Sequence, residues 1–206
     1  MIRSLLIITS VWLLTSCTIE ETTTFNSDFS GRTTIKMDLS MMVQMMASMD
    51  SSGMAKKGFY SGINEKMGDG VDSMRNANPS LKLDMNFDTV SNKLSISYSF
   101  SSLEEANNIG AQFSEGKQKP ENSDYKWIKK MEALQMPEVD TGDGQSGKMQ
   151  GMDQMIYSMS RTFPNKVVRV SDDRLKISAD GKTVTMNLSF KELTDNPMKN
   201  PTVYFK

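Results

Sequence analysis

Residues 81–100 read LKLDMNFDTVSNKLSISYSF, a segment in which apolar and polar residues alternate twice. The apolar positions are Leu81, Leu83, Met85 and Phe87 in the first half and Leu94, Ile96, Tyr98 and Phe100 in the second. A period of two is typical of a strand that buries one face, and residues 88–93 between the halves, which are polar except for Val90, suit a turn. The segment therefore predicts an antiparallel β-hairpin with one face in a hydrophobic core.

Helical patterns lie on both sides of this hairpin. Before it, one helical face would contain Leu39, Met42, Val43, Met46 and Met49. A weaker pattern predicts a helix over residues 63–75, and Ser102 with Glu105 has the spacing of a capping box that would begin another. A further helix is predicted over residues 148–162, with an apolar stripe of Met149, Met152, Ile156, Met159 and Phe163.

The remaining patterns predict strands. Residues 25–39 alternate, with a bend at Gly31, and the last third contains strand patterns at 166–170, 174–178, 183–190 and 202–205. Asp180-Gly181 is a favoured hairpin turn. This order of elements predicts an α+β fold: an antiparallel sheet of hairpins and a C-terminal meander, with amphipathic Met-rich helices packed on one face.

The first sixteen residues have the features of a secretory signal peptide. Arg3 is followed by an apolar run from Leu5 to Leu14, and small residues come next. Ten helical residues extend about 15 Å, roughly half the hydrocarbon thickness of a bilayer. The run is therefore too short to span a membrane, and the pattern predicts a segment that is cleaved on export.

The segment ends in Leu14-Thr15-Ser16-Cys17, which resembles the lipobox of bacterial lipoproteins. The resemblance implies diacylglyceryl transfer to the Cys17 thiol, cleavage before Cys17 and acylation of the new amino group. Several acyl chains, at about 0.8 kcal/mol per buried CH₂, hold a protein stably on a membrane. Cys17 is thus the predicted lipidation site and the membrane the predicted partner.

The residues after Cys17 bear on localisation. Thr18 replaces the aspartate that retains many enteric lipoproteins at the inner membrane, which favours the outer membrane. The pair Glu20-Glu21 is similar to the surface-export signals of Bacteroidota lipoproteins, and it fits an acidic patch in a linker equally well. We therefore expect a lipid-anchored protein of the cell envelope, on the periplasmic or surface face of the outer membrane.

These features divide the chain into three parts. Residues 1–16 are the expected signal peptide, residues 17–24 the lipidated cysteine and a polar tether, and residues 25–206 a single α+β domain. This length is ordinary for one domain and needs no metal or disulfide to fold.

Composition excludes several classes of function. The chain has 24 Lys and Arg against 25 Asp and Glu, and no stretch collects one sign, so a nucleic-acid partner is not expected. There is no histidine, which removes Ser-His-Asp and Cys-His catalysis and most zinc sites. Cys17, the single cysteine, is assigned to the lipid. The sequence therefore predicts no catalytic residues, no metal site and no cofactor, and a protein that is not an enzyme.

The 19 methionines allow three readings. They are dense in two groups, one of Met41, Met42, Met45, Met46 and Met49, the other of Met149, Met152, Met155 and Met159. Methionine fills irregular cores, its thioether binds Cu(I), and flexible Met surfaces accept apolar ligands or partner peptides. We predict core packing and a non-enzymatic binding or structural role, with an envelope protein or an apolar ligand as the possible partner. The alternatives are a Met-rich periplasmic Cu(I)-binding protein and a carboxylate-dependent hydrolase using a pair among the 25 acidic residues.

Two motifs in the last third carry a family resemblance. Phe163-Pro164-Asn165-Lys166-Val167 and the run Asp180-Gly181-Lys182-Thr183-Val184-Thr185 resemble the C-terminal part of LppM-type bacterial lipoprotein domains. In those domains a Phe-Pro-x-x-Val segment leads into a strand meander with a glycine-containing turn. The tryptophan often found after the turn is absent, since Met186 follows Thr185. The resemblance implies a cell-envelope domain and brings no catalytic residues with it.

Overall fold

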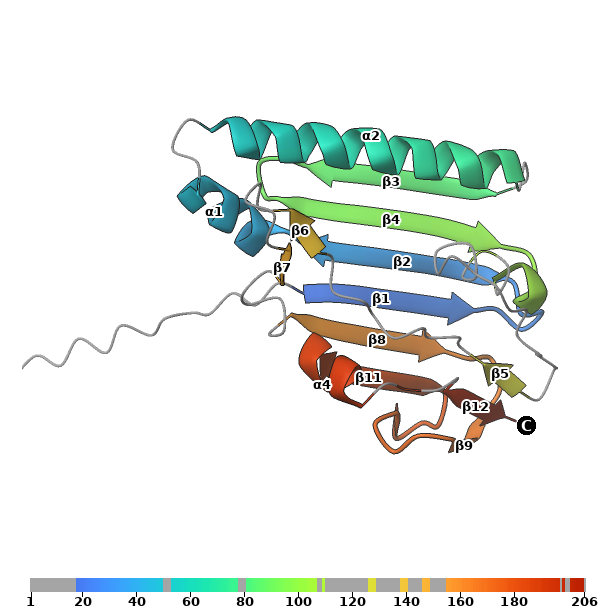
Figure 1. The fold of residues 1–206 in the computed structure, drawn as a ribbon. Helices are drawn as coiled ribbons and strands as arrows, with labels where there is room; N and C mark the ends of the chain where they lie inside the picture. Colours follow the sequence, from blue (N-terminus) through green and yellow to red (C-terminus); the bar gives the residue numbers. More distant parts are fainter. Residues whose placement is uncertain are drawn as a thin grey trace, which may run out of the picture.

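The computed structural model describes residues 18–49, 53–77, 81–106, 109, 126–128, 138–140, 146–148, 155–196, 198 and 201–205. The larger elements are β1 (Thr18–Phe25), β2 (Gly31–Asp38), α1 (Ser40–Met49), α2 (Met54–Ala77), β3 (Lys82–Asp88), β4 (Lys93–Phe100), β8 (Ile156–Thr162), β11 (Thr183–Ser189) and α4 (Phe190–Asp195). The shorter strands are β5 (Lys126–Ile128), β6 (Glu138–Asp140), β7 (Ser146–Lys148), β9 (Val167–Val170), β10 (Lys176–Ile177) and β12 (Thr202–Phe205). Figure 1 shows one large sheet with α1 and α2 beside it.

The large sheet has the strand order β10-β11-β8-β1-β2-β4-β3. The predicted hairpin is confirmed as β3 and β4, which pair antiparallel from Lys82 opposite Ser99 to Asp88 opposite Lys93. The α+β class is confirmed as well. The sheet is mixed, however, because β8 lies parallel to β1, with Thr18 opposite Ile156.

The two faces of this sheet differ in chemistry. One face packs into the core through side chains that alternate along each strand, among them Phe25, Leu83, Ile96, Met159, Val184 and Met186. The opposite face presents hydroxyl groups from several neighbouring strands, including Thr22, Thr34, Ser97, Ser160, Thr162 and Thr183. On that face the Thr162 and Thr183 hydroxyls lie 3.1 Å apart. The fold thus has one apolar face that is buried and one polar face, as expected for a sheet whose strands pair mostly antiparallel.

The helices pack against the apolar face near β3. Met41 and Met42 of α1 and Phe59, Ile63 and Met74 of α2 are half-buried against the core. Near the end of α2, Arg75 Nη2 donates a hydrogen bond of 3.0 Å to the Leu83 carbonyl oxygen of the edge strand β3. The predicted helix over 63–75 is part of the longer helix α2. Because α2 contacts the edge strand β3, it protects this edge of the sheet. Within the described residues, no helix is both long and apolar enough to cross a membrane.

The C-terminal strands do not form a simple meander. β11 pairs with β8 and β10, and Asp180-Gly181 makes the predicted turn before β11, whereas β9 pairs with β12 in a separate three-stranded sheet with β5. The helix α4 begins at a capping box, in which Ser189 Oγ accepts from the Glu192 amide and the Glu192 carboxylate accepts from the Ser189 amide. The predicted strand over 183–190 thus ends at this cap.

Three predictions over the N-terminal and central segments are wrong. Residues 18–24 are not a tether, because they form the central strand β1. Residues 25–39 are not one strand with a bend, because Asn26 to Ser30 make a turn in which Phe29 has a φ of 60°. In the predicted helix over 148–162, residues 156–162 form strand β8; residues 149–154 lie outside the described part of the chain.

Gly31 marks the turn between β1 and β2 for a steric reason. A Cβ at this position would lie 2.7 Å from Cζ of Phe100 and would also meet the carbonyl oxygen of Thr24. The Phe100 ring occupies that space and lies 5.4 Å from the ring of Phe25. The glycine therefore allows close packing of aromatic rings at this end of the sheet.

Candidate functional site

Polar side chains interrupt the apolar face at the centre of the sheet. Glu21 and Thr23 project from β1 on the same face as Phe25, and Tyr157 and Arg161 do so from the parallel strand β8. Thr33 of β2 and Tyr98 of β4 lie in register beside them. We call these six residues, Glu21, Thr23, Thr33, Tyr98, Tyr157 and Arg161, the buried polar cluster.

An ion pair lies at the centre of the cluster. Nη2 of Arg161 donates to Oε1 of Glu21, and the Tyr157 hydroxyl donates to Oε2 of the same carboxylate. The Arg161 side chain is 4% exposed and that of Glu21 is 13% exposed. Nη1 of Arg161 also lies 3.3 Å from the Ser160 carbonyl oxygen. Both oxygens of the Glu21 carboxylate thus accept hydrogen bonds, one from a guanidinium and one from a phenol.

A second set of hydrogen bonds lies beside this pair and crosses β1, β2 and β4. The hydroxyl oxygens of Thr23 and Thr33 lie 2.8 Å apart, and the Thr33 hydroxyl is also hydrogen bonded to the phenol of Tyr98. Thr23 and Thr33 are both 3% exposed. Buried polar groups are stable only when they have partners, and these hydroxyls supply them to one another.

The two tyrosines are held in the protonated form. Burial raises the pKa of Tyr157 well above its ordinary value of 10.0, and the negative charge of Glu21 raises it further. Burial also raises the pKa of Tyr98, again with a contribution from Glu21, while its hydrogen bond to Thr33 acts in the opposite direction. Both phenols therefore stay neutral at physiological pH, and the Tyr157 hydroxyl donates its proton to Glu21.

This arrangement limits the chemistry available to Glu21. A carboxylate that is paired with a guanidinium is a weak base, because the cation stabilises the anion. Glycoside hydrolysis needs two carboxyl groups flanking one bond, and Glu21 is the only acidic residue among the six of the cluster. Within the described part of the chain, no group of three or more His, Cys, Asp or Glu side chains could hold a metal ion.

The predicted site residue, Cys17, lies outside the described residues and directly precedes β1. In the first methionine group, Met41, Met42, Met45 and Met46 are on α1 and half-buried. Met155 and Met159 are 4% and 1% exposed near and within β8, whereas Met149 and Met152 are not described. The two predicted methionine stripes therefore do not share one kind of element, since the first is helical and Met159 is in a strand.

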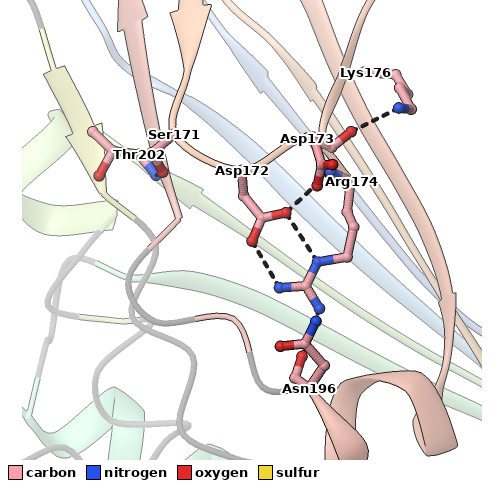
Figure 2. A network of polar contacts seen from close by, with 7 residues as sticks. All are labelled: Ser171, Asp172, Asp173, Arg174, Lys176, Asn196 and Thr202. Atoms are coloured by element: carbon pink, nitrogen blue, oxygen red, sulfur yellow. Dashed lines mark hydrogen bonds and ion pairs between the residues drawn. The ribbon is translucent and has the colours of Figure 1, made fainter.

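A second polar network joins the C-terminal loops, as Figure 2 shows. Nε and Nη2 of Arg174 donate to the two carboxylate oxygens of Asp172 at 2.9 and 2.7 Å, and Nη1 donates to the Asn196 carbonyl oxygen at 2.5 Å. Beside it, the Ser171 hydroxyl accepts a bond of 2.8 Å from the Thr202 amide. These contacts tie the loop after β9 to the end of α4 and to β12, which indicates a structural role.

The Asp172 pair predicts a loss of stability in acid. The hydrogen bonds and charge of Arg174 hold the pKa of Asp172 below its ordinary value of 3.8. A lowered pKa contributes stability that is present above the unfolded value and is lost as pH falls through the folded one. Asp172→Asn should lower the free energy of unfolding at about pH 7 by about 1.5–3 kcal/mol. Urea unfolding measures the difference in free energy of unfolding between the wild type and Asp172→Asn, and this difference should decrease below about pH 4. A difference that stays constant down to about pH 2 would contradict a stabilising role for the ionised Asp172 carboxylate.

The sequence patterns do not predict the buried polar cluster. They place Glu21 in a tether and Arg161 near the end of a helix. The sequence signal that could reveal the cluster is that every second residue of a strand lies on the same face. Ile19, Glu21, Thr23 and Phe25 share one face in this way, and so do the alternate residues from Tyr157 to Phe163. Polar residues at two of the four inward positions of β1 concealed that pattern.

Comparison with known proteins identifies no relative. No family model matches the chain, and neither the curated proteins nor the solved structures contain a match.

Proposed function

We propose that the protein is a bacterial lipoprotein of the cell envelope, anchored by lipid on Cys17, with a non-enzymatic binding or structural role. The observation that carries the proposal is the lipobox-like Leu14-Thr15-Ser16-Cys17 directly before β1. Cleavage before Cys17 would leave every described strand and helix intact, because the first of them begins at Thr18. The first described strand would then begin at the residue directly after the lipidated cysteine.

The ion pair and the protonated phenols of the buried polar cluster support a non-enzymatic role. Its one carboxylate is neutralised by Arg161, and its two phenols are held protonated. General acid–base catalysis needs a group whose pKa lies near the working pH, and none of these pKa shifts moves a group toward neutrality. We assign the cluster a role in holding β1, β8, β2 and β4 in register.

Cys17→Ser should abolish lipidation, because the thiol is the acceptor of the diacylglyceryl group. Growth with labelled palmitate should mark the wild type and leave the variant unlabelled, and the variant should leave the membrane fraction. Thr22→Ser, on the exposed side of β1, is the matched control and should retain both label and location. Palmitate in the Cys17→Ser protein would overturn the proposed function.

A further inference from the structure

The start of β1 lies at one defined end of the large sheet. We call it the anchor end, because Cys17 precedes Thr18 there and consecutive Cα atoms are about 3.8 Å apart. The register places at this end the starts of β4 and β8 and the last residues of β2, β3 and β11. In Figure 1 the anchor end is at the left, with α1, the beginning of α2 and α4 beside it.

The parts at the anchor end hold one another in place. The Leu39 amide, just before α1, donates a hydrogen bond of 2.9 Å to the Asn92 carbonyl oxygen in the β3–β4 turn. From α2, the Tyr60 hydroxyl lies 2.5 Å from Oδ1 of Asn92, and its ring is 5.5 Å from that of Phe87. These bonds fix α1, the first turns of α2 and the β3–β4 turn as one surface.

Exposed apolar side chains project from this surface. Val90, in the β3–β4 turn, is 91% exposed, and Met54, the first residue of α2, is 73% exposed. Met54 precedes Tyr60 by six residues, which places it about 9 Å further along the helix, away from the body of the sheet. α1 contains no charged residue, and its Met45 and Met46 are only half-buried. Both exposed apolar side chains therefore belong to elements at the anchor end of the sheet.

The anchor brings this surface close to lipid. β4 and β3 are the second and third strands from β1, so at about 4.8 Å per strand their turn lies roughly 10–14 Å from the start of β1. A lipid on Cys17 would leave no linker between the bilayer and β1. The strand ends around β1 must then lie at the membrane surface.

We propose that the anchor end rests on the bilayer that holds the acyl chains of Cys17, with Val90 and Met54 inserted at the lipid interface. This inference rests on the proposed function. The sheet then projects from the membrane, and its hydroxyl-rich face, together with the opposite end of the strands, faces water. Val168 of β9, which is 51% exposed, lies toward that opposite end, since the Val167 amide bonds to the Gly181 carbonyl oxygen in the turn before β11.

The test uses a fluorescent label at single thiols in the lipidated full-length protein. Once Cys17 is a thioether, Val90→Cys or Met54→Cys introduces the only free thiol, and Val168→Cys is the matched control for an exposed valine away from the anchor. Each protein is labelled with an environment-sensitive dye and placed in phosphatidylcholine vesicles with and without doxyl-labelled lipid. We expect a blue shift and loss of fluorescence at positions 90 and 54, and neither at position 168.

The outcomes separate the two proposals. Protein that fails to float with vesicles would overturn the proposed function. In other outcomes, the protein floats with the vesicles while the labels at 90 and 54 stay unquenched, or while all three labels are quenched alike. Either result would overturn the proposed contact of Val90 and Met54 with the bilayer, but not the lipid anchor on Cys17. A blue shift of the dye at position 90 that depends on the protein-to-lipid ratio would indicate that the anchor end contacts a second copy of the chain. This result would also overturn the proposed contact with the bilayer.

Discussion

Arg161→Leu is expected to lower the free energy of unfolding by about 3–5 kcal/mol, the usual cost of leaving a buried charge without its partner. The leucine removes the guanidinium, and the Glu21 carboxylate stays on the covered face of the sheet with the Tyr157 hydroxyl still donating to it. Urea unfolding at neutral pH measures the loss. The deficit should shrink as pH falls, because protonation of Glu21 removes the unpaired charge.

The double variant, Glu21→Leu with Arg161→Leu, is the control for this result. Removing both charges together leaves no ion unpaired, and such replacements are often neutral or stabilising. We therefore expect the double variant to be more stable than Arg161→Leu alone. Equal stability of the two variants, or a loss below about 1 kcal/mol in the single one, would show that the pair does not bear on folding.

Met159→Ala is expected to lower the free energy of unfolding by about 2–5 kcal/mol, the usual range for truncating a buried methionine. Met159 is 1% exposed and lies between Glu21 of β1 and Met186 of β11 in the sheet register. Met159→Leu should cost less than about 1.5 kcal/mol, because volume and apolarity are retained. Thermal or urea unfolding of both variants provides the measurement.

The same leucine substitution separates core packing from metal binding. If sulfur ligands at Met159 or on α1 bind Cu(I), leucine should leave folding intact and abolish binding, since only the thioether coordinates the metal. A competition titration with Cu(I) on the wild type, on Met159→Leu and on a variant with Met41, Met42, Met45 and Met46 replaced by leucine distinguishes the two. Tight binding in the wild type that a well-folded variant lacks would contradict the packing interpretation.

Local sequence patterns correctly predict the secondary structure where a strand or helix has its own apolar face. The β3–β4 hairpin, the helix after Leu39, the turn at Asp180-Gly181 and the last strand all follow from short-range periodicity and turn chemistry. In these segments the inward residues are apolar, so the pattern and the structure coincide. The α+β class could be predicted for the same reason.

The central strands were decided by contacts between distant residues. β1 has polar residues at Glu21 and Thr23 on its inward face, which in isolation resembles a solvated linker. Glu21 can be buried there only because Arg161, 140 residues further along the chain, supplies a counter-charge. No local rule can predict a partner at that separation, nor that β8 would lie parallel to β1.

The sequence by itself thus determined the strands with apolar faces and the motif around Cys17, and it contains no histidine. The tertiary structure alone decided that the residues after Cys17 form the middle of the sheet, and that two buried charges face each other there. The physical reason is desolvation. A charged side chain can occupy a sheet interior only where folding brings an opposite charge to it, and that pairing is a property of the whole fold.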